Sequence, residues 1–161
     1  MLIDRIHPEP ATVDLTELLD GLRLGDLAPP DRPYLVLNMI ASADGAATIG
    51  GRTRSLGGEH DRALFHGLRE QVDAVMAGAG TAGIERYGRT VRDPERRRRR
   101  TERGLAAEPL ACIVSGHLSL APEIPLLQEP ESRVLILTRE AEELGSLPAE
   151  VEYLREAPGG H

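Results

Sequence analysis

Lysine is absent from this sequence of 161 residues, and all 19 basic side chains are arginines. A GC-rich coding bias produces the same composition, so the arginine count alone does not indicate nucleic-acid binding. Tryptophan is also absent, and three tyrosines with one phenylalanine offer no platform on which bases could stack. The net charge of −7 makes most of the surface repel a phosphate backbone. The composition therefore argues against a nucleic-acid partner.

Cysteine occurs once, at Cys112, which excludes an intramolecular disulfide and argues against a zinc site built from thiolates. His60 and His66 are six residues apart and do not share a helix face, so we expect no metal site. No apolar run approaches the roughly 18 to 20 residues that cross a bilayer, and the first residues lack the pattern of a signal peptide. We expect a cytoplasmic protein without a membrane segment.

The positive charge is concentrated in one stretch. Residues 92–103 hold seven arginines and three acidic side chains, a local net charge of +4, which leaves −11 for the rest of the chain. Such a charge run forms either a solvated helix or a mobile excursion, and the sequence favours the solvated helix.

Short apolar runs alternate with helical or longer connecting segments. A helix is expected over residues 59–71, and strands are expected at residues 34–40, 73–77, 110–114, 133–138 and 151–154. The runs at 34–40 and 133–138 are almost continuously apolar, as in strands that are covered on both faces. The pattern predicts an α/β fold with three αβα layers and a mainly parallel sheet.

The N-terminal residues differ from this pattern. We expect residues 1–33 to be an extension with one helix over residues 15–24, capped by Asp14. Prolines at 29, 30 and 33 then interrupt regular structure. The main domain is expected at residues 34–156, and the last residues, 157–161, form a flexible tail.

Two loops could carry chemistry. Ser42, Asp44 and Gly45 follow the first expected strand, where they form either a strand-ending turn or part of a ligand site. The second loop, residues 78–83, matches G-x-G-x-x-G after a strand, and its bare amides could receive a phosphate. The acidic residue that a dinucleotide fold needs about 20 positions later would fall in the arginine-rich stretch, so this loop fits that fold poorly. The loop is compatible with a glycine loop that contacts a cofactor in a way that differs from the dinucleotide fold.

Nucleophilic catalysis has little support. Ser42 and Ser55 have no histidine and acid at the spacing of a hydrolase triad. No catalytic residue can be identified from the sequence pattern.

Five segments occur together in a familiar order: residues 32–39, residues 41–45, residues 68–75, Gly78-Ala79-Gly80-Thr81 and Glu85-Arg86-Tyr87-Gly88. In this order and spacing they resemble the reductase domain of riboflavin biosynthesis. This pyrimidine-reductase family has a dihydrofolate-reductase-like fold. The resemblance extends from about residue 32 to residue 137.

The resemblance implies NADPH as cofactor and an aminopyrimidine or pterin as substrate. It implies that the family reduces the ribosyl chain of 5-amino-6-(phosphoribosylamino)uracil to a ribityl chain, and that the protein is a homodimer. By motif, the residues carried over to the cofactor are Ala41, Ser42, Asp44, Gly78, Gly80, Thr81 and Glu85. Ser55 and Arg69 are carried over to the substrate, where an arginine suits a phosphate. Arg52, Arg54 and residues 92–103 are the candidates for the 2′-phosphate of NADPH.

The sequence departs from the family at two points. Glu85 stands where the family usually has aspartate. The family also continues for about 70 to 100 residues more, beginning with a strand and a Glu-Gly-Gly-Pro turn that holds the cofactor phosphates, and this sequence contains no such turn. We therefore expect a fold that is incomplete at its C-terminus. The alternative to an NADPH-dependent reductase is a truncated, non-catalytic remnant that binds a nucleotide or forms a dimer.

Overall fold

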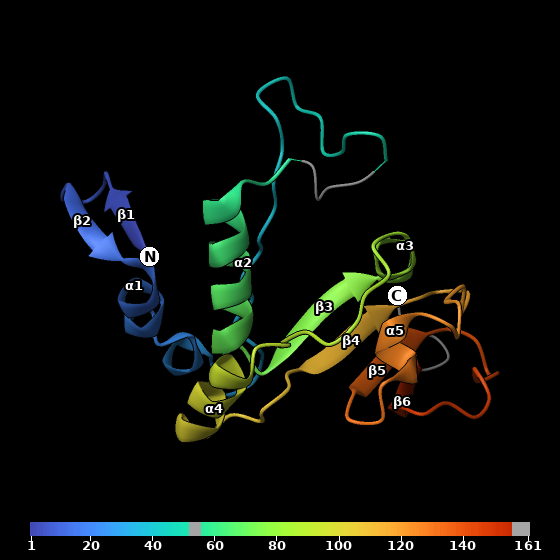
Figure 1. The fold of residues 1–161 in the computed structure, drawn as a ribbon. Helices are drawn as coiled ribbons and strands as arrows, with labels where there is room; N and C mark the ends of the chain where they lie inside the picture. The colour runs from blue at the N-terminus through green and yellow to red at the C-terminus, as the bar shows by residue number, and fades with distance from the viewer. Residues whose placement is uncertain (52–55, 156–161) are drawn as a thin grey trace. The chain divides into compact units, whose positions relative to one another are not determined.

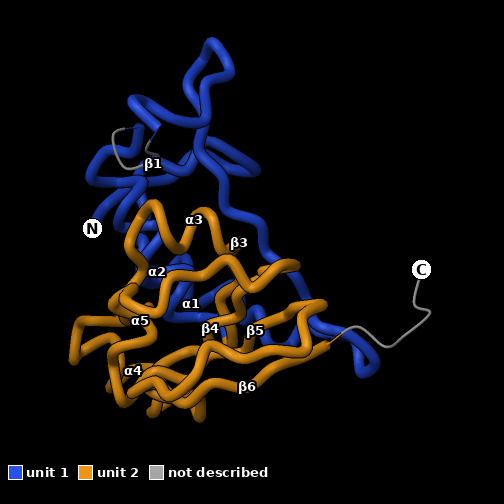
Figure 2. The backbone as a smooth tube through the Cα atoms, turned by 90° about the vertical axis from the view of Figure 1, so that its right-hand side faces the viewer, with its two compact units in different colours: residues 1–72 blue, residues 73–161 orange. Residues whose placement is uncertain are grey.

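The structure is a computed structural model that describes residues 1–51 and 56–155 (Figure 1). The chain divides into two compact units, residues 1–72 and residues 73–161 (Figure 2). Each unit is described by itself below. None of the helices in the described ranges is long and apolar enough to cross a membrane.

The first unit begins with a small antiparallel hairpin that the sequence did not predict. Its strands are β1 (Leu2–Arg5) and β2 (Ala11–Asp14), and the register pairs Leu2 with Asp14. Each strand has four residues and a mixed polar pattern, so neither gives a clear period-2 signal. The expected N-terminal extension therefore contains a β-hairpin in addition to its helix.

Helix α1 (Leu15–Gly21) starts where the sequence predicted and ends earlier. Asp14 caps it, because a side-chain oxygen of Asp14 accepts a hydrogen bond of 2.8 Å from the Thr16 amide. Gly21 is a poor helix former, and Arg23 takes a left-handed conformation with φ 45°. A 3₁₀ turn, η1 (Leu24–Leu27), follows.

Helix α2 (Glu59–Gln71) confirms the predicted helix and its bounds. It packs against α1 in the same unit, where the Gln71 side-chain amide donates to the Asp20 carboxylate at 3.0 Å.

The predicted strand at residues 34–40 is wrong. In the structure this run has no regular secondary structure, and Leu35, Leu37 and Met39 are 78%, 84% and 77% exposed. A strand needs a neighbour that supplies its ladder of hydrogen bonds, and no strand pairs with this run in the described part of the chain. An apolar run alone does not supply that neighbour.

The second unit holds the predicted parallel sheet. Its strands are β3 (Ala74–Gly78), β4 (Leu110–Val114), β5 (Arg133–Thr138) and β6 (Glu150–Arg155), joined side by side in that order and all parallel. The connections carry α3 (Ala79–Ile84), α4 (Pro94–Glu102) and α5 (Pro125–Gln128). The α/β class with a mainly parallel sheet is confirmed.

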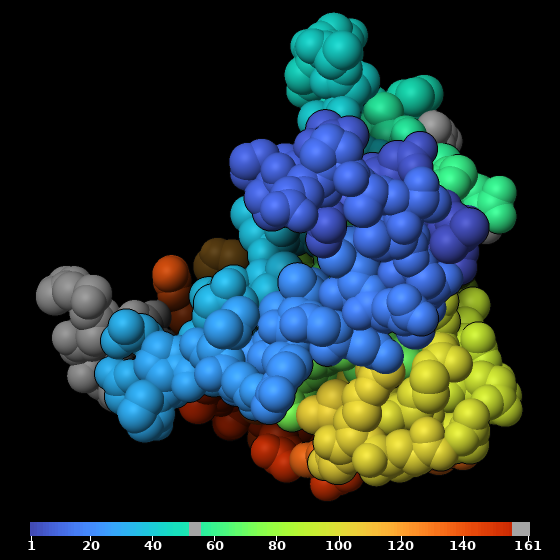
Figure 3. All heavy atoms as spheres, turned by 90° about the vertical axis from the view of Figure 1, so that its left-hand side faces the viewer, coloured from blue at the N-terminus to red at the C-terminus, as the bar shows by residue number. Residues whose placement is uncertain are grey.

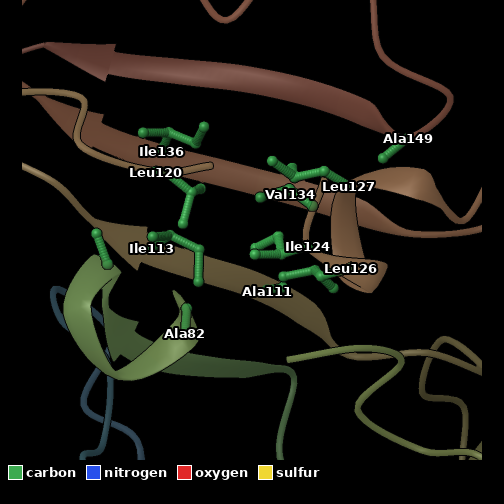
Figure 4. Packing of buried hydrophobic residues seen from close by; sticks show 11 residues of the cluster. Ala82, Ala111, Ile113, Leu120, Ile124, Leu126, Leu127, Val134, Ile136 and Ala149 are labelled. Atoms are coloured by element: carbon green, nitrogen blue, oxygen red, sulfur yellow. The ribbon is translucent and has the colours of Figure 1, made fainter. Parts of the chain in front are cut away.

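The core of this unit lies on one face of the sheet. Ile113 of β4 and Ile136 of β5 are 1% and 0% exposed, and side chains from α3, α5 and their connections pack over them (Figure 4). Strands that add in one direction send every right-handed crossover to the same face, which explains why this face is covered. The buried cluster is Ala79, Ala82, Ala111, Ile113, Leu120, Ile124, Leu126, Leu127, Val134, Ile136 and Ala149.

The arginine-rich stretch forms a helix, α4, as predicted, and its atoms reach the surface in Figure 3. The expectation that it is solvated is wrong for Arg100, which is 0% exposed and donates from Nε to the Ala106 carbonyl at 2.8 Å. Five successive helical residues turn through more than a full circle, so one of five arginines must face inward.

A half-buried carboxylate, Glu108, lies near Arg100. Glu108 accepts hydrogen bonds from the backbone amides of Thr90 and Val91, which fixes the segment before α4. Burial raises the pKa of this carboxyl above its usual value, although those amides and the positive charges of Arg89 and Arg100 act in the opposite direction.

Candidate functional site

The glycine loop predicted from the sequence lies at the junction of β3 and α3. Strand β3 ends at Gly78, and the helix begins at Ala79, which is buried with Ala82 in the core. These two alanines anchor the short helix on the sheet. Gly80 and Thr81, on the other side of the first turn, are exposed.

No feature of the fold requires glycine at 78 or 80. Gly78 has φ −73° and ψ 150°, a conformation that any residue adopts, and neither glycine has a left-handed φ. A Cβ atom built on Gly78 or Gly80 meets no atom of the described residues within 4 Å. Turn geometry and packing therefore do not explain these glycines. A glycine without a Cβ atom lets a ligand approach the backbone closely, and open space beside Gly78 and Gly80 is compatible with such an approach.

Glu85 and Arg86 end helix α3. The Glu85 amide donates to the Thr81 carbonyl at 3.0 Å, and the Tyr87 amide reaches back to the Ala82 carbonyl at 2.9 Å. Between them Arg86 takes φ 47°, a conformation that L-residues rarely adopt. This is a helix-ending motif that usually carries glycine. The structure thus gives Glu85 a role in helix termination, and the role in cofactor binding stays a prediction.

The carboxyl ends of all four strands meet at one edge of the sheet. The register aligns Gly78 with Val114, Val114 with Leu137, and Leu137 with Leu154. The glycine loop therefore lies in line with the segments that follow β4 and β5. In parallel sheets this edge is where ligands collect.

Ser115 and Thr138 at this edge were missed by the sequence reasoning. Ser115 is 3% exposed, and its amide donates to the Leu137 carbonyl at 2.9 Å. Its hydroxyl has no hydrogen-bond partner in the part of the chain that the structure describes. Thr138 is 5% exposed and accepts from the Glu140 amide at 3.2 Å. The signal that could have found them was a hydroxyl side chain at the carboxyl end of an apolar run: Ser115 follows β4 directly, and Thr138 is the last residue of β5.

One histidine–carboxylate contact bridges the two segments. Nδ1 of His117 lies 3.3 Å from Oε1 of Glu140, and the Arg139 amide donates to the Gly116 carbonyl at 3.3 Å. The two contacts hold residues 115–117 and 138–140 together. His117 is the basic side chain of this pair, and Glu140 offsets its charge when the ring is protonated.

The other predicted loop, residues 41–45, is a tight turn. The Gly45 amide donates to the Ser42 carbonyl at 2.9 Å, and Gly45 has φ 85°. The Ser42 hydroxyl donates to the Asp44 carboxylate and accepts from the Ala46 amide at 3.1 Å. The hydrogen bond from Ser42, followed by that from the Ala46 amide, lowers the pKa of Asp44 below its usual value. The turn interpretation is confirmed, whereas the strand expected before it is absent. Ala41, the first residue of this loop, is exposed.

The two substrate candidates differ in what the structure describes. Arg69 lies in the last turn of α2, where a positive charge suits the helix C-terminus, and its guanidinium carbon lies 3.9 Å from the ring centre of Phe65. Packing and the helix dipole give Arg69 a structural role in this position. Ser55, with Arg52 and Arg54, lies outside the described residues.

The predicted site residues fall into two groups, one in each unit. Ala41, Ser42, Asp44 and Arg69 belong to the first unit, and Gly78, Gly80, Thr81 and Glu85 belong to the second. Within the described ranges, no group of three or more His, Cys, Asp or Glu side chains is arranged to hold a metal ion.

Many arginines of α4 have acidic partners. Arg98 pairs with Glu95 at 2.9 Å and also with Glu102, and Arg97 pairs with Glu131 at 3.0 Å. These pairs neutralise much of the positive stretch. They make it a weaker candidate for the 2′-phosphate of a cofactor than the sequence suggested.

A nicotinamide cofactor fits the carboxyl edge on two observations. The open space beside Gly78 and Gly80 is a cradle that a Cβ atom would fill, and the buried Ser115 hydroxyl lacks a partner in the described chain. A phosphate oxygen accepts hydrogen bonds from both kinds of group.

Comparison with known proteins finds two relatives that carry the same enzyme name. The chain is 30% identical over 106 residues to the 2,5-diamino-6-ribosylamino-4(3H)-pyrimidinone 5′-phosphate reductase of Archaeoglobus fulgidus, a match that covers 65% of this chain and 48% of that protein. It is 24% identical over 110 residues to the protein of the same name from Methanothermobacter thermautotrophicus, covering 68% and 48%. The chain therefore spans about half the length of the curated relatives that it matches.

A solved structure agrees with these sequences. The crystal structure of a pyrimidine reductase-like protein from Corynebacterium diphtheriae superposes with a TM-score of 0.60 at 25% identity, over 73% of this chain and 53% of that one. The RibD C-terminal domain matches residues 33–160, nearly the whole sequence after the first hairpin and helix. The chain belongs to the RibD C-terminal domain family, whose relatives named here are pyrimidinone phosphate reductases and a pyrimidine reductase-like protein.

Proposed function

We propose that this chain is part of an NADPH-dependent reductase that acts on a phosphorylated ribosylaminopyrimidine. The observation that carries the proposal is the glycine segment at the end of β3, where backbone faces open space without a structural need for glycine. The names of the relatives support the reaction class. A pterin substrate remains the alternative within the same class.

The chemistry is a two-electron reduction of the sugar. Bound NADPH would supply the hydride that, together with a proton, converts the ribosyl chain into the ribityl chain. In this proposal Gly78, Gly80 and Thr81 approach the cofactor through their backbone, and the Ser115 hydroxyl donates to a phosphate oxygen. Ala41, Ser42, Asp44 and Glu85 stay assigned to the cofactor, and Arg69 and Ser55 to the substrate phosphate.

Several expectations from the sequence belong to this proposal. The reductase domain is residues 34–156, with residues 1–33 as an extension and 157–161, which lie outside the described residues, as a tail. The protein is cytoplasmic and acts as a homodimer. Because the chain spans about half of its relatives, the second candidate function is a non-catalytic, nucleotide-binding or dimer-forming remnant.

The test is a titration of NADPH and NADH, followed by the fluorescence of the reduced nicotinamide. We expect NADPH to bind more tightly than NADH, and Gly80→Val to weaken NADPH binding by about tenfold or more, a loss of about 1.4 kcal/mol. Gly83→Val is the matched control, since Gly83 lies in the same short helix and also has no neighbour within 4 Å of a built Cβ.

Equal losses of affinity in the two variants would show that helix propensity, rather than ligand contact, explains the effect. Equal affinity for the two cofactors would contradict NADPH as the cofactor. NADPH binding without oxidation in the presence of substrate would favour the remnant.

A further inference from the structure

Helices α3 and α4 of the second unit end in the same backbone motif. At the end of α4 the Gly104 amide donates to the Thr101 carbonyl at 3.0 Å, and the Leu105 amide donates to the Arg100 carbonyl at 3.0 Å. Gly104 has φ 80°, which is the left-handed conformation that this motif requires. Helix α4 therefore ends on the residue that adopts this conformation without strain.

Helix α3 repeats these hydrogen bonds with a different residue at the left-handed position. The Arg86 amide donates to the Gly83 carbonyl at 3.1 Å, and the Tyr87 amide donates to the Ala82 carbonyl at 2.9 Å. Arg86 has φ 47° and takes the place that Gly104 has in α4. Since a Cβ atom is unfavourable in this conformation, arginine is a costly choice for the fold at this position.

The glycines of α3 lie where the fold does not need them. Gly80 and Gly83 are inside the helix, neither has a left-handed φ, and glycine weakens a helix interior. The segment thus has glycine where another residue would stabilise it, and arginine at 86 where glycine would. A strained residue that the surrounding contacts do not explain points to a function.

The Arg86 side chain makes no contact that offsets this strain. It is exposed, and among the described residues its guanidinium has no hydrogen-bond or ion-pair partner. Arg89 and Arg97 of the same connection and helix α4, by contrast, both pair with Glu131. A positive charge suits the C-terminus of a helix, but that effect does not require arginine at the left-handed position.

We propose that the Arg86 guanidinium binds a phosphomonoester group of a ligand that approaches the glycine segment. A guanidinium matches a phosphate with two parallel hydrogen bonds. Arg86 follows Gly80 by six residues, about 9 Å at the rise of a helix, and a nucleotide is long enough to contact both. The inference rests on the proposed function, which offers two such groups: the 2′-phosphate of NADPH and the phosphate of the ribosylaminopyrimidine.

The test uses Arg86→Gly, a variant in which stability and binding should change in opposite directions. Relief of the left-handed strain should raise Tm by about 2–4 °C. If the ligand is the 2′-phosphate, the ratio of the Kd of NADH to that of NADPH should fall about tenfold, measured by the fluorescence of the reduced nicotinamide. Arg23→Gly is the matched control, because Arg23 is also exposed with φ 45°, and it should leave this ratio unchanged.

The substrate phosphate is tested with D-ribose 5-phosphate as the probe and D-ribose as its control. The NMR signal of the Arg86 Nε–H group is the one that is missing from the spectrum of Arg86→Gly. If the ligand is the substrate phosphate, this signal should shift with D-ribose 5-phosphate and not with D-ribose, while the ratio of the two Kd values stays unchanged. Arg86→Asn is a second variant, since asparagine tolerates a left-handed backbone and carries no charge.

Two results would overturn the proposal. One is an unchanged ratio of Kd values together with no shift of the Arg86 signal, and the other is an equal loss of the ratio in Arg23→Gly. Equal affinity of the unsubstituted chain for NADPH and NADH contradicts the proposed cofactor instead. In that case the titration with D-ribose 5-phosphate alone decides whether Arg86 binds a phosphate.

Discussion

Residues 34–40 and strand β5 have the same sequence signal and opposite structures. Both are nearly continuous apolar runs, yet β5 lies between β4 and β6 with Ile136 fully buried, whereas Leu37 is 84% exposed. The difference is the presence of neighbours on both sides. An apolar run indicates that a segment is suited to a sheet interior, and the neighbouring strands decide whether it becomes a strand.

The same contrast separates the two units. Among the described residues, the buried hydrophobic side chains of the first unit are Leu15 and Leu19, and all others belong to the second unit. The second unit therefore holds the larger packed core within its own residues. Substitutions should have unequal effects in the two units.

The largest difference is expected for truncation of the two apolar runs. Ile136→Ala removes a fully buried side chain and should lower the free energy of unfolding by about 2–5 kcal/mol. Leu37→Ala, at an exposed position, should change it by about 0.5 kcal/mol or less. Urea denaturation of both variants gives the comparison. A loss at Leu37 as large as that at Ile136 would mean that residues 34–40 are buried in solution.

A smaller difference is expected for two arginines with left-handed backbone, one in each unit. Arg86 has φ 47° within the helix-ending contacts of α3, and Arg23 has φ 45° between α1 and η1. Arg86→Gly should raise the free energy of unfolding by about 1 kcal/mol, because glycine adopts this conformation without strain.

Arg23→Gly should raise the free energy of unfolding by less. The Arg23 side chain is exposed and has few packed neighbours, so the backbone around it can relieve the strain. Thermal denaturation of the two variants in parallel measures both gains. If Arg23→Gly stabilises the protein as much as Arg86→Gly, packing of the unit does not determine the strain.

The smallest effects concern pH, and the two units should respond with opposite sign. Burial raises the pKa of Glu108, so the folded protein keeps this proton at pH values where the unfolded chain, with a pKa near 4.5, has lost it. Stability should therefore fall as the pH rises from 4.5 through the raised pKa. Glu108→Gln retains the acceptor for Thr90 and Val91 and should flatten this slope.

Asp44 gives the opposite dependence. Its pKa is lowered by the Ser42 hydroxyl and the Ala46 amide, so the turn should lose stability as the pH falls from 3.8 through the lowered pKa. Asp44→Asn should remove that loss. Denaturation at a series of pH values from about 2 to about 8 separates the two slopes. Slopes unchanged by both substitutions would contradict these assignments.

Much of the sheet could be predicted from the sequence because its strands are covered and paired. The runs at 110–114 and 133–138 became β4 and β5 with the expected bounds, and the weaker signal at 151–154 lies within β6. The absence of a strand at 34–40 could not be predicted, because no local pattern reports whether a distant partner strand is present. The inward-facing Arg100 depends on helix phase relative to the rest of the unit, which a run of identical residues does not reveal.

The candidate site was predicted in part for the same reason. The glycine loop was found because glycine spacing after a strand is a local signal. Ser115 and Thr138 were missed because their significance depends on the alignment of three strand ends, which only the register shows.

Cys112 has a consequence for experiments on this protein. It is the single cysteine of the chain and is 6% exposed. It lies beside Met76 on the face of the sheet opposite the buried cluster. Burial raises the pKa of its thiol, so reaction with a thiol reagent should be slow while the sulfur atom stays buried. The rate at which this one sulfur atom is labelled therefore measures how readily Cys112 becomes exposed, and no probe has to be introduced into the protein.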